Sequence, residues 1–170
     1  MKNLLKPVFV IAFAMLVSGN IFAQQKFAHI NRTELIQSMP EFKTSGEKLE
    51  AYGKELQSSF EEVQVEYNKR LDDFQKNQET WTDEKKEVKT QELISIQRRL
   101  EEQRTSIQES YGKKEEELFM PVLKKASDAI NKVAKAGGYI YVFESSAVHY
   151  VDDTQSTNLL PAVKKELGIN

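Results

Sequence analysis

The strongest constraint on this chain is a long stretch without helix breakers. Between Gly53 and Gly112 there is neither glycine nor proline, and apolar residues recur every eleven positions. The first series comprises Leu49, Tyr52, Leu56, Phe60, Val63, Tyr67, Leu71 and Phe74. Eleven residues in three turns give about 3.67 residues per turn, close to the 3.6 of a straight α-helix. The pattern therefore predicts a long, nearly straight helix with one apolar stripe.

The same spacing returns later in the chain and predicts a second helix with a matching stripe. Its members form two parallel series: Ile96, Ile107, Leu118, Ala129 and Leu100, Tyr111, Val122, Val133. An isolated helix of this kind would leave its stripe in water, so we expect the two helices to form an antiparallel hairpin. Its tip should lie near residues 79–83, where the pattern lapses and Thr80 and Thr82 are good N-caps. The alternative is one continuous helix that pairs with another subunit.

The first residues have the pattern of a secretory signal peptide. Lys2 and Lys6 precede an apolar run at 8–17, and small or polar residues lead to Ala23. We predict a signal peptide over residues 1–23; the alternative, an uncleaved membrane anchor, would need about 20 apolar residues. Removing the leader changes the net charge from −2 to about −4, which argues against nucleic-acid binding. The chain has no cysteine, which excludes disulfides and a lipoprotein anchor.

The compact part must be built from the two ends of the chain. Residues 26–30 are a strand candidate, and Asn31 with Glu34 has capping-box spacing for a short helix. Ser38 is then expected to cap the outgoing arm helix, with Pro40 in its first turn.

The arm helices have further boundary signals. The outgoing helix should run to about Gln78, and the returning helix from Asp83 toward Ala136. Pro121 lies inside the returning helix and should mark the point where the arm enters the body. The pair Gly137-Gly138 should end this helix.

Two further strands are predicted near the C-terminus. Residues 139–143 are apolar on both faces, as in a buried strand, and residues 147–151 would complete a hairpin that residues 26–30 can join. Pro161 should open a short final helix that ends at Gly168. Three short strands cannot form a stable sheet alone, so we expect self-association to close the sheet. The residues predicted to form this self-associating body are Phe27, Ile30, Tyr139, Tyr141, Phe143, Val148 and Tyr150.

These boundaries divide the chain into three parts. Residues 1–23 are the signal peptide, residues 24–40 with 121–170 form the β-rich body, and residues 41–120 form the helical-hairpin arm. The predicted fold class is α+β, mainly α with a small β body.

The sequence contains no recognisable catalytic motif. We find no glycine-rich phosphate loop and no nucleophile elbow, so the sequence predicts neither an enzyme nor a cofactor site. His29 and His149, with Asp152 and Asp153 near the latter, could conceivably bind a metal; ordinary body residues are the better interpretation. Trp81, near the predicted tip, is either a contact residue or the hydrophobic cap of the turn.

Several segments, in this order, resemble the Skp/OmpH family of periplasmic chaperones. The segments are Phe27-Ala28-His29-Ile30-Asn31, Ser38-Met39-Pro40-Glu41-Phe42-Lys43, Leu118-Phe119-Met120-Pro121-Val122, Gly138-Tyr139-Ile140-Tyr141-Val142-Phe143 and Asn158-Leu159-Leu160-Pro161-Ala162-Val163. The resemblance implies a homotrimer whose small β-barrel body carries three helical hairpins around a cavity. It also implies a periplasmic protein that holds unfolded outer-membrane proteins without ATP. The chain departs from the family in its acidic arms, and in Asn158 where aspartate is frequent.

The sequence thus leads to one hypothesis and one alternative. The hypothesis is a holdase that binds unfolded envelope proteins, its only other partner being itself, with no stable insertion into the membrane. Apolar residues outside the stripe are candidate client contacts, namely Val65, Trp81 and Ile94. The alternative is a structural spacer or adaptor that uses its arms to reach one folded partner.

Overall fold

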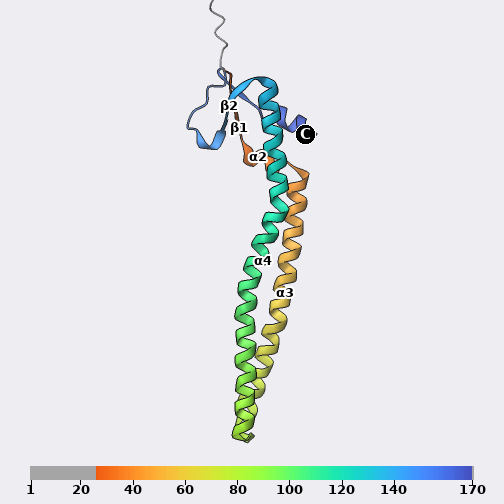
Figure 1. Cartoon of the computed structure of the whole chain (residues 1–170), viewed down its shortest axis with the longest axis vertical. Helices are drawn as coiled ribbons and strands as arrows, with labels where there is room; N and C mark the ends of the chain where they lie inside the picture. The colour runs from red at the N-terminus through yellow and green to blue at the C-terminus, as the bar shows by residue number, and fades with distance from the viewer. Residues whose placement is uncertain (1–25, 170) are drawn as a thin grey trace, which may run out of the picture.

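A computed structural model describes residues 26–169, and the predicted signal peptide lies outside the described residues. A long helical hairpin extends from a small body that contains the sheet (Figure 1). In chain order the elements are β1 (Lys26–Ile30), α2 (Arg32–Gln37), α3 (Pro40–Asn77), the 3-10 turn η1 (Gln78–Thr80), α4 (Asp83–Gly137), β2 (Tyr139–Glu144), the 3-10 turn η2 (Ser145–Ala147), β3 (Ser156–Asn158) and α5 (Leu160–Leu167). The prediction of a mainly helical chain with a small sheet is confirmed.

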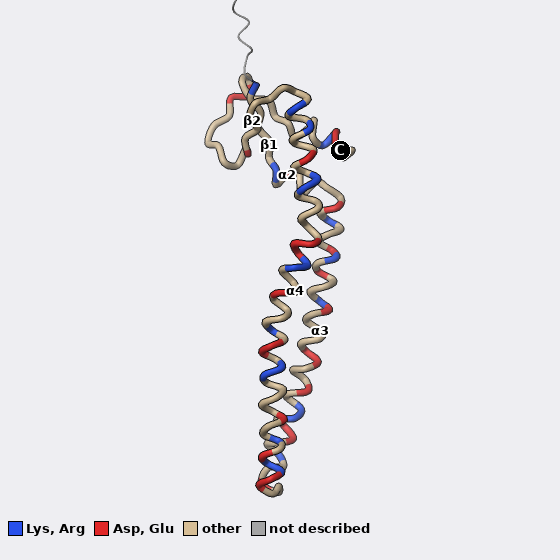
Figure 2. Tube along the Cα trace, in the orientation of Figure 1, with Lys and Arg blue, Asp and Glu red and all other residues tan. Residues whose placement is uncertain are grey.

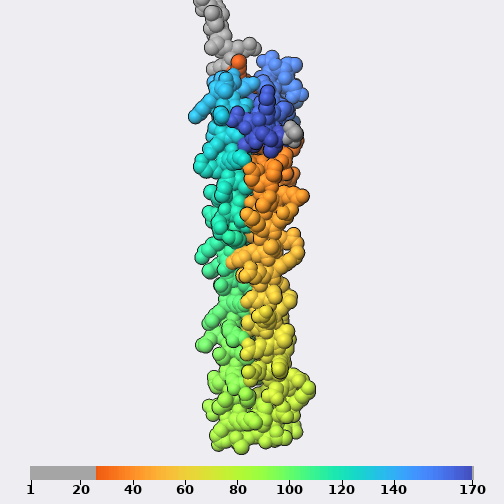
Figure 3. Space-filling view, turned by 90° about the vertical axis from the view of Figure 1, so that its right-hand side faces the viewer, coloured from red at the N-terminus to blue at the C-terminus, as the bar shows by residue number. Residues whose placement is uncertain are grey.

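The predicted hairpin is confirmed, and the alternative of one continuous helix is wrong. Helices α3 and α4 lie side by side along the whole arm (Figures 1 and 3). The chain reverses through η1 and Trp81, and Thr82 caps α4 by accepting a hydrogen bond from the amide of Lys85 at 3.3 Å. Leu49 and Ile96, from the two stripes, are each only 7% exposed. The stripes therefore form the seam that joins the two helices.

The start of α3 differs from the prediction. Ser38 does not cap this helix. Its amide donates a hydrogen bond to the carbonyl of Glu34 at 3.0 Å, and its hydroxyl donates one to the carbonyl of Leu35 at 2.7 Å. Ser38 thus closes the preceding short helix, and Met39 becomes the N-cap of α3 without a side-chain hydrogen bond. Pro40 opens α3, as its missing amide proton and fixed φ allow.

Helix α4 runs unbroken through Pro121 and ends at the predicted glycines. Gly138 adopts φ +69, a left-handed conformation that suits glycine, and its amide donates to the carbonyls of Ala134 and Lys135. The buried residues that follow Pro121 face the sheet and α5, beginning with Val122. Of the helices in residues 26–169, none has the length and apolar character needed to span a bilayer.

The sheet is parallel, and its strand order is β2-β1-β3. The predicted hairpin of residues 139–143 with residues 147–151 is therefore wrong. Residues 145–147 form η2, residues 148–151 belong to no strand, and the third strand is Ser156–Asn158. Strand β1 is central, whereas β2, which we expected to be buried, lies at an edge and exposes Ile140, Tyr141 and Phe143.

Packing of the C-terminal residues explains this topology. Leu159, Leu160 and Val163 are buried in the body core, where they meet residues of α4 and of β1. The amide of Leu159 donates to the carbonyl of His29 at 2.9 Å, which fixes β3 beside β1. A hairpin directly after β2 would keep these apolar side chains away from α4, so the chain crosses to the far side of β1 instead.

We expect the seam to determine the stability of the arm. Replacing Ile96 with alanine should lower the free energy of unfolding by about 2–3 kcal/mol, because it opens a cavity between the helices. The matched change Ile94→Ala removes a side chain of the same helix that is 51% exposed. It should change the free energy of unfolding by less than about 0.5 kcal/mol. Urea unfolding followed by circular dichroism measures both; equal losses would contradict the assignment of the seam.

Candidate functional site

One face of the sheet is aromatic and largely open. Side chains alternate along a strand, so Phe27 and His29 of β1 share this face with their register partners Tyr141 and Phe143 of β2. We call these four residues the outer sheet face. The rings of Phe27, Tyr141 and Phe143 stack with centroids 5.9 to 6.4 Å apart. Because Tyr141 is 59% and Phe143 44% exposed, this cluster presents a contiguous apolar surface to water.

The loop between β2 and β3 lines an open pocket beside the outer sheet face. The pocket holds about 260 Å³ and is lined by Phe27, His29, Phe143, Val148, Tyr150, Val151, Asp152, Gln155 and Ser156. Val148 has the extended backbone of a strand residue, with φ −115 and ψ 137, but pairs with no strand among residues 26–169. Tyr150 is 81% exposed. The loop therefore adds apolar side chains to the outer sheet face.

Two of the predicted body residues pack in the chain's own core. Ile30 is 2% exposed, because it alternates with His29 and so faces α4. Tyr139 also packs against this core, since a register shift between Lys26 and Phe27 turns it away from Tyr141. The remaining predicted residues, Phe27, Tyr141, Phe143, Val148 and Tyr150, lie on the outer side.

The two histidines have different surroundings. His29 is 8% exposed, and its Nδ1 lies 2.9 Å from the hydroxyl of Ser156, whereas His149 is exposed on the loop. The Oδ1 of Asp152 accepts hydrogen bonds from the hydroxyl and the amide of Thr154, and these bonds lower the pKa of the Asp152 carboxyl. Within residues 26–169, no three His, Asp or Glu side chains are grouped as a metal site would require.

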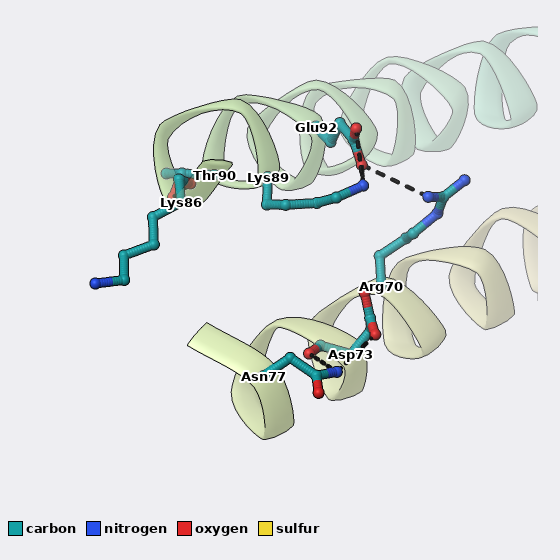
Figure 4. A network of polar contacts seen from close by, with 7 residues as sticks. All are labelled: Arg70, Asp73, Asn77, Lys86, Lys89, Thr90 and Glu92. Carbon is teal, nitrogen blue, oxygen red and sulfur yellow. Dashed lines mark hydrogen bonds and ion pairs between the residues drawn. The ribbon is translucent and has the colours of Figure 1, made fainter. Parts of the chain in front are cut away.

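Polar contacts cross the arm at several levels. Glu92 of α4 lies 3.5 Å from Arg70 of α3 and 2.8 Å from Lys89 of its own helix (Figure 4). The hydrogen bond from Lys89, with the nearby charges of Lys89 and Arg70, lowers the pKa of Glu92. A similar ion pair joins Glu66 and Arg99. Exposed pairs of this kind contribute little stability.

Closer to the body, α3 and α4 are joined by side-chain hydrogen bonds and by the ion pair of Glu41 with Lys125. The hydroxyl of Ser45 donates to the carbonyl of Leu118 at 3.1 Å, and Gln103 donates to the hydroxyl of Ser59 at 2.9 Å. The seam is thus apolar along most of its length, with polar contacts between the helices at intervals.

The predicted contact residues Val65 and Ile94 are exposed on different helices of the arm. Val65 is 65% exposed and lies in a groove lined otherwise by charged residues of α3, including Glu62 and Arg70. Ile94 is 51% exposed on α4 and is absent from that groove. The structure therefore does not join these residues into one patch.

Trp81 packs as a cap over the tip of the arm. Its ring meets the ring of Phe74 edge to face at 5.7 Å, and the ammonium of Lys85 lies 5.0 Å from its centroid. The side chain is only partly exposed. This geometry favours the capping interpretation over that of a free contact residue.

Three further exposed side chains of the arm were not among the predicted contacts. Val88 is 57% and Met120 54% exposed, and both lie outside the eleven-residue series, as Val65 and Ile94 do. Applying the same criterion to every apolar residue of the arm would have found them. Tyr111 belongs to the series and is 39% exposed. Its ring packs over Gly53, where an added Cβ would approach it to 3.2 Å.

Charge is distributed along the whole arm. Residues 41–120 contain 20 Asp and Glu and 14 Lys and Arg. Acidic and basic residues are intermixed on both helices (Figure 2). The arm therefore has a mixed surface with an acidic excess, as the sequence predicted.

Comparison with known proteins identifies the family of the chain. The family model described as "Outer membrane protein (OmpH-like)" matches residues 26–167, which include both the body and the arm. This chain belongs to the OmpH-like family. The predicted resemblance is therefore confirmed.

Relatives of this OmpH-like protein match it over nearly its whole length. A protein named chaperone protein Skp from Vibrio cholerae is 20% identical over 169 residues, covering 96% of this chain and 100% of the relative. A protein of the same name from Photorhabdus luminescens is 24% identical over 154 residues, covering 91% and 92%. A solved OmpH-like outer membrane chaperone structure from Caulobacter crescentus shares the fold, with a TM-score of 0.73, 12% identity and coverage of 84% and 83%.

We expect the tip of this OmpH-like protein to depend on the Trp81–Phe74 contact. The change Phe74→Ala should shift the fluorescence emission of Trp81, the only tryptophan, to longer wavelength, because its ring becomes more hydrated. It should also loosen the tip by about 1 kcal/mol, which hydrogen exchange over residues 74–85 measures. The matched change Phe60→Ala, farther along the seam, should leave the emission maximum unchanged. An unchanged emission maximum in Phe74→Ala would contradict the cap.

Proposed function

We propose that this OmpH-like protein is a periplasmic holdase that binds unfolded outer-membrane proteins in a cavity between the arms of a homotrimer. The observation that carries the proposal is a contrast within one chain. Among residues 26–169, the two stripes of the arm pack against each other and bury Leu49 and Ile96, whereas Tyr141 and Phe143 of the outer sheet face stay exposed to water. The family and the names of the relatives support the same function.

The outer sheet face is the surface that we assign to self-association. Both β2 and β3 are edge strands, so each sheet has two unpaired edges. If the β2 edge of one copy pairs with the β3 edge of the next, the contact is head-to-tail, and a ring of copies can close it. Such closure would form a small barrel, bury Tyr141 and Phe143, and leave no edge open.

The arms of such a trimer would surround a common space. Clients would meet exposed apolar side chains, including Val65, Val88, Ile94 and Met120, each a weak contact on a charged surface. Many weak contacts from three arms add up to tight but rapidly exchanging binding. No step needs ATP. The scattered positions favour this over an adaptor, which would need one dominant patch for a folded partner.

Oligomeric state tests the assembly. Protein produced with its own leader and purified from the periplasmic fraction should have the mass of a trimer in light scattering. The double change Tyr141→Ser with Phe143→Ser should weaken association at least about 100-fold, because both rings leave the interface. The matched surface change Val65→Ser should have no effect on the mass. A wild-type monomer would refute the trimer.

Aggregation assays test the holdase activity. A urea-unfolded outer-membrane β-barrel should stay soluble after dilution into the trimer without nucleotide, and the Tyr141→Ser/Phe143→Ser variant should protect it poorly, since separate arms lose their combined avidity. The same barrel, folded in detergent, should not be bound. Equal binding of folded and unfolded barrel, or aggregation in the presence of the trimer, would contradict the proposal.

A further inference from the structure

Three exposed apolar side chains of the arm each have a carboxylate beside them. Val65, Val88 and Met120 are 65%, 57% and 54% exposed, and each follows a glutamate by three or four residues. The pairs are Glu62–Val65, Glu84–Val88 and Glu116–Met120, which we call the mixed pairs. Residues at this spacing share a helix face, with Cβ atoms about 5–6 Å apart. Each mixed pair therefore offers an apolar and an anionic group to the same ligand.

The glutamates of the mixed pairs can accept a further partner. All three are exposed, and none of them takes part in an ion pair within residues 26–169. Glu62 lines the same groove as Val65. The carboxylate of Glu84 accepts hydrogen bonds from its own amide and from the hydroxyl of Thr82, which lower its pKa. Because a carboxylate has about four acceptor sites, these bonds leave room for a cation.

Most cations of the arm near the mixed pairs are engaged elsewhere. The ammonium of Lys85, next to Glu84, lies over the ring of Trp81. Lys124, one turn after Met120, pairs with Asp128 at 2.7 Å. Only the groove of Val65 has a competing cation within it, Lys69, since Arg70 of the same groove pairs with Glu92.

The distribution of charge within the chain points to the same kind of ligand. The described parts of the body, residues 26–40 and 121–169, contain 8 Lys and Arg and 6 Asp and Glu. The arm, in contrast, contains 14 basic and 20 acidic residues, and the acidic ones occur on both helices (Figure 2). A positively charged ligand is thus attracted to the arm and not to the body.

Lysine and arginine side chains fit a mixed pair at both of its ends. Each has an aliphatic stem that packs on apolar surface and a charged head that remains hydrated or pairs with an anion. With the stem on the apolar residue of a mixed pair, the head reaches the glutamate one turn away. A purely apolar side chain would contact only one of the two groups, and an acidic one would be repelled.

We propose that the arm holds clients by their lysine and arginine side chains, with each stem on Val65, Val88 or Met120 and each cation on the neighbouring glutamate. This inference rests on the proposed holdase function and names the class of client, namely unfolded chains whose segments carry Lys and Arg. An exposed ion pair changes affinity by only about 1.4- to 5-fold. Several mixed pairs acting on one client multiply this effect.

The first experiment changes the client and leaves the chaperone as it is. A urea-unfolded outer-membrane β-barrel carrying a fluorescent label is diluted into wild-type protein from the periplasmic fraction, at low salt. The same barrel with its lysines acetylated is the comparison, because acetylation removes the charge and keeps the stem. We expect the dissociation constant of the acetylated barrel to be at least about tenfold higher.

The second experiment changes the chaperone. The triple change Glu62→Gln, Glu84→Gln and Glu116→Gln should weaken binding of the unmodified barrel by about tenfold, because each cation loses its partner. The matched control is Glu55→Gln, Glu101→Gln and Glu109→Gln, which removes the same charge from exposed glutamates of the arm. None of these three has an exposed apolar side chain three or four residues after it, so the control should lose less than about threefold.

The outcomes separate the inference from the proposed function. Equal or tighter binding of the acetylated barrel overturns the inference and leaves a holdase that uses apolar contacts alone. Equal losses in the two triple variants also overturn it, since net charge and not the mixed pairs would then attract the client. Failure of the wild type to bind either barrel refutes the holdase itself. The comparison of the two barrels uses only wild-type protein, so it decides the matter even if a triple variant does not assemble.

Discussion

The whole structure depends on the seam between α3 and α4. A helix of 38 residues with one apolar stripe cannot remain in water alone, and the chain supplies the matching stripe on α4. Leu49 and Ile96 are buried between the two helices, and polar contacts such as Arg70–Glu92 also join them. Because the apolar stripes of α3 and α4 pack against each other, the arm can extend far from the body without a further partner.

In the body, by contrast, apolar side chains are covered on only one face of the sheet. Its sheet is covered on one face by α4 and α5, with Ala28 and Ile30 in the core, while the other face presents stacked rings to water. The sheet is parallel, and parallel sheets are normally covered on both faces. This asymmetry is the physical basis of the proposed trimer.

The helices of the arm and the elements β1, α2 and α5 of the body were predictable from local signals, whereas the Ser38 cap and the pairing of the strands were not. Periodicity, Thr82 as a cap and Gly138 as a stop are local signals, and the structure confirms each of them. The strand order failed because it depends on non-local packing: Leu159 and Val163 must reach the core, which places β3 beside β1. Local apolar content suggested a buried strand at residues 139–143, but an edge strand that awaits a partner has the same composition.

The candidate contact residues, too, were predictable only in part from the sequence. The sequence could single out Val65 and Ile94 because they break the stripe, and could list Phe27, Tyr141 and Phe143 as body residues. It could not tell that those rings are exposed while Ile30, on the opposite face of its strand, is buried in the core. Nor could it show that Trp81 packs against Phe74. The sequence by itself determined the helical arm, since helix formation and capping act over a few residues. Only the tertiary structure decided which side chains remain exposed, because that depends on contacts between segments more than a hundred residues apart, such as Lys26 with Tyr139 and Ala28 with Thr157.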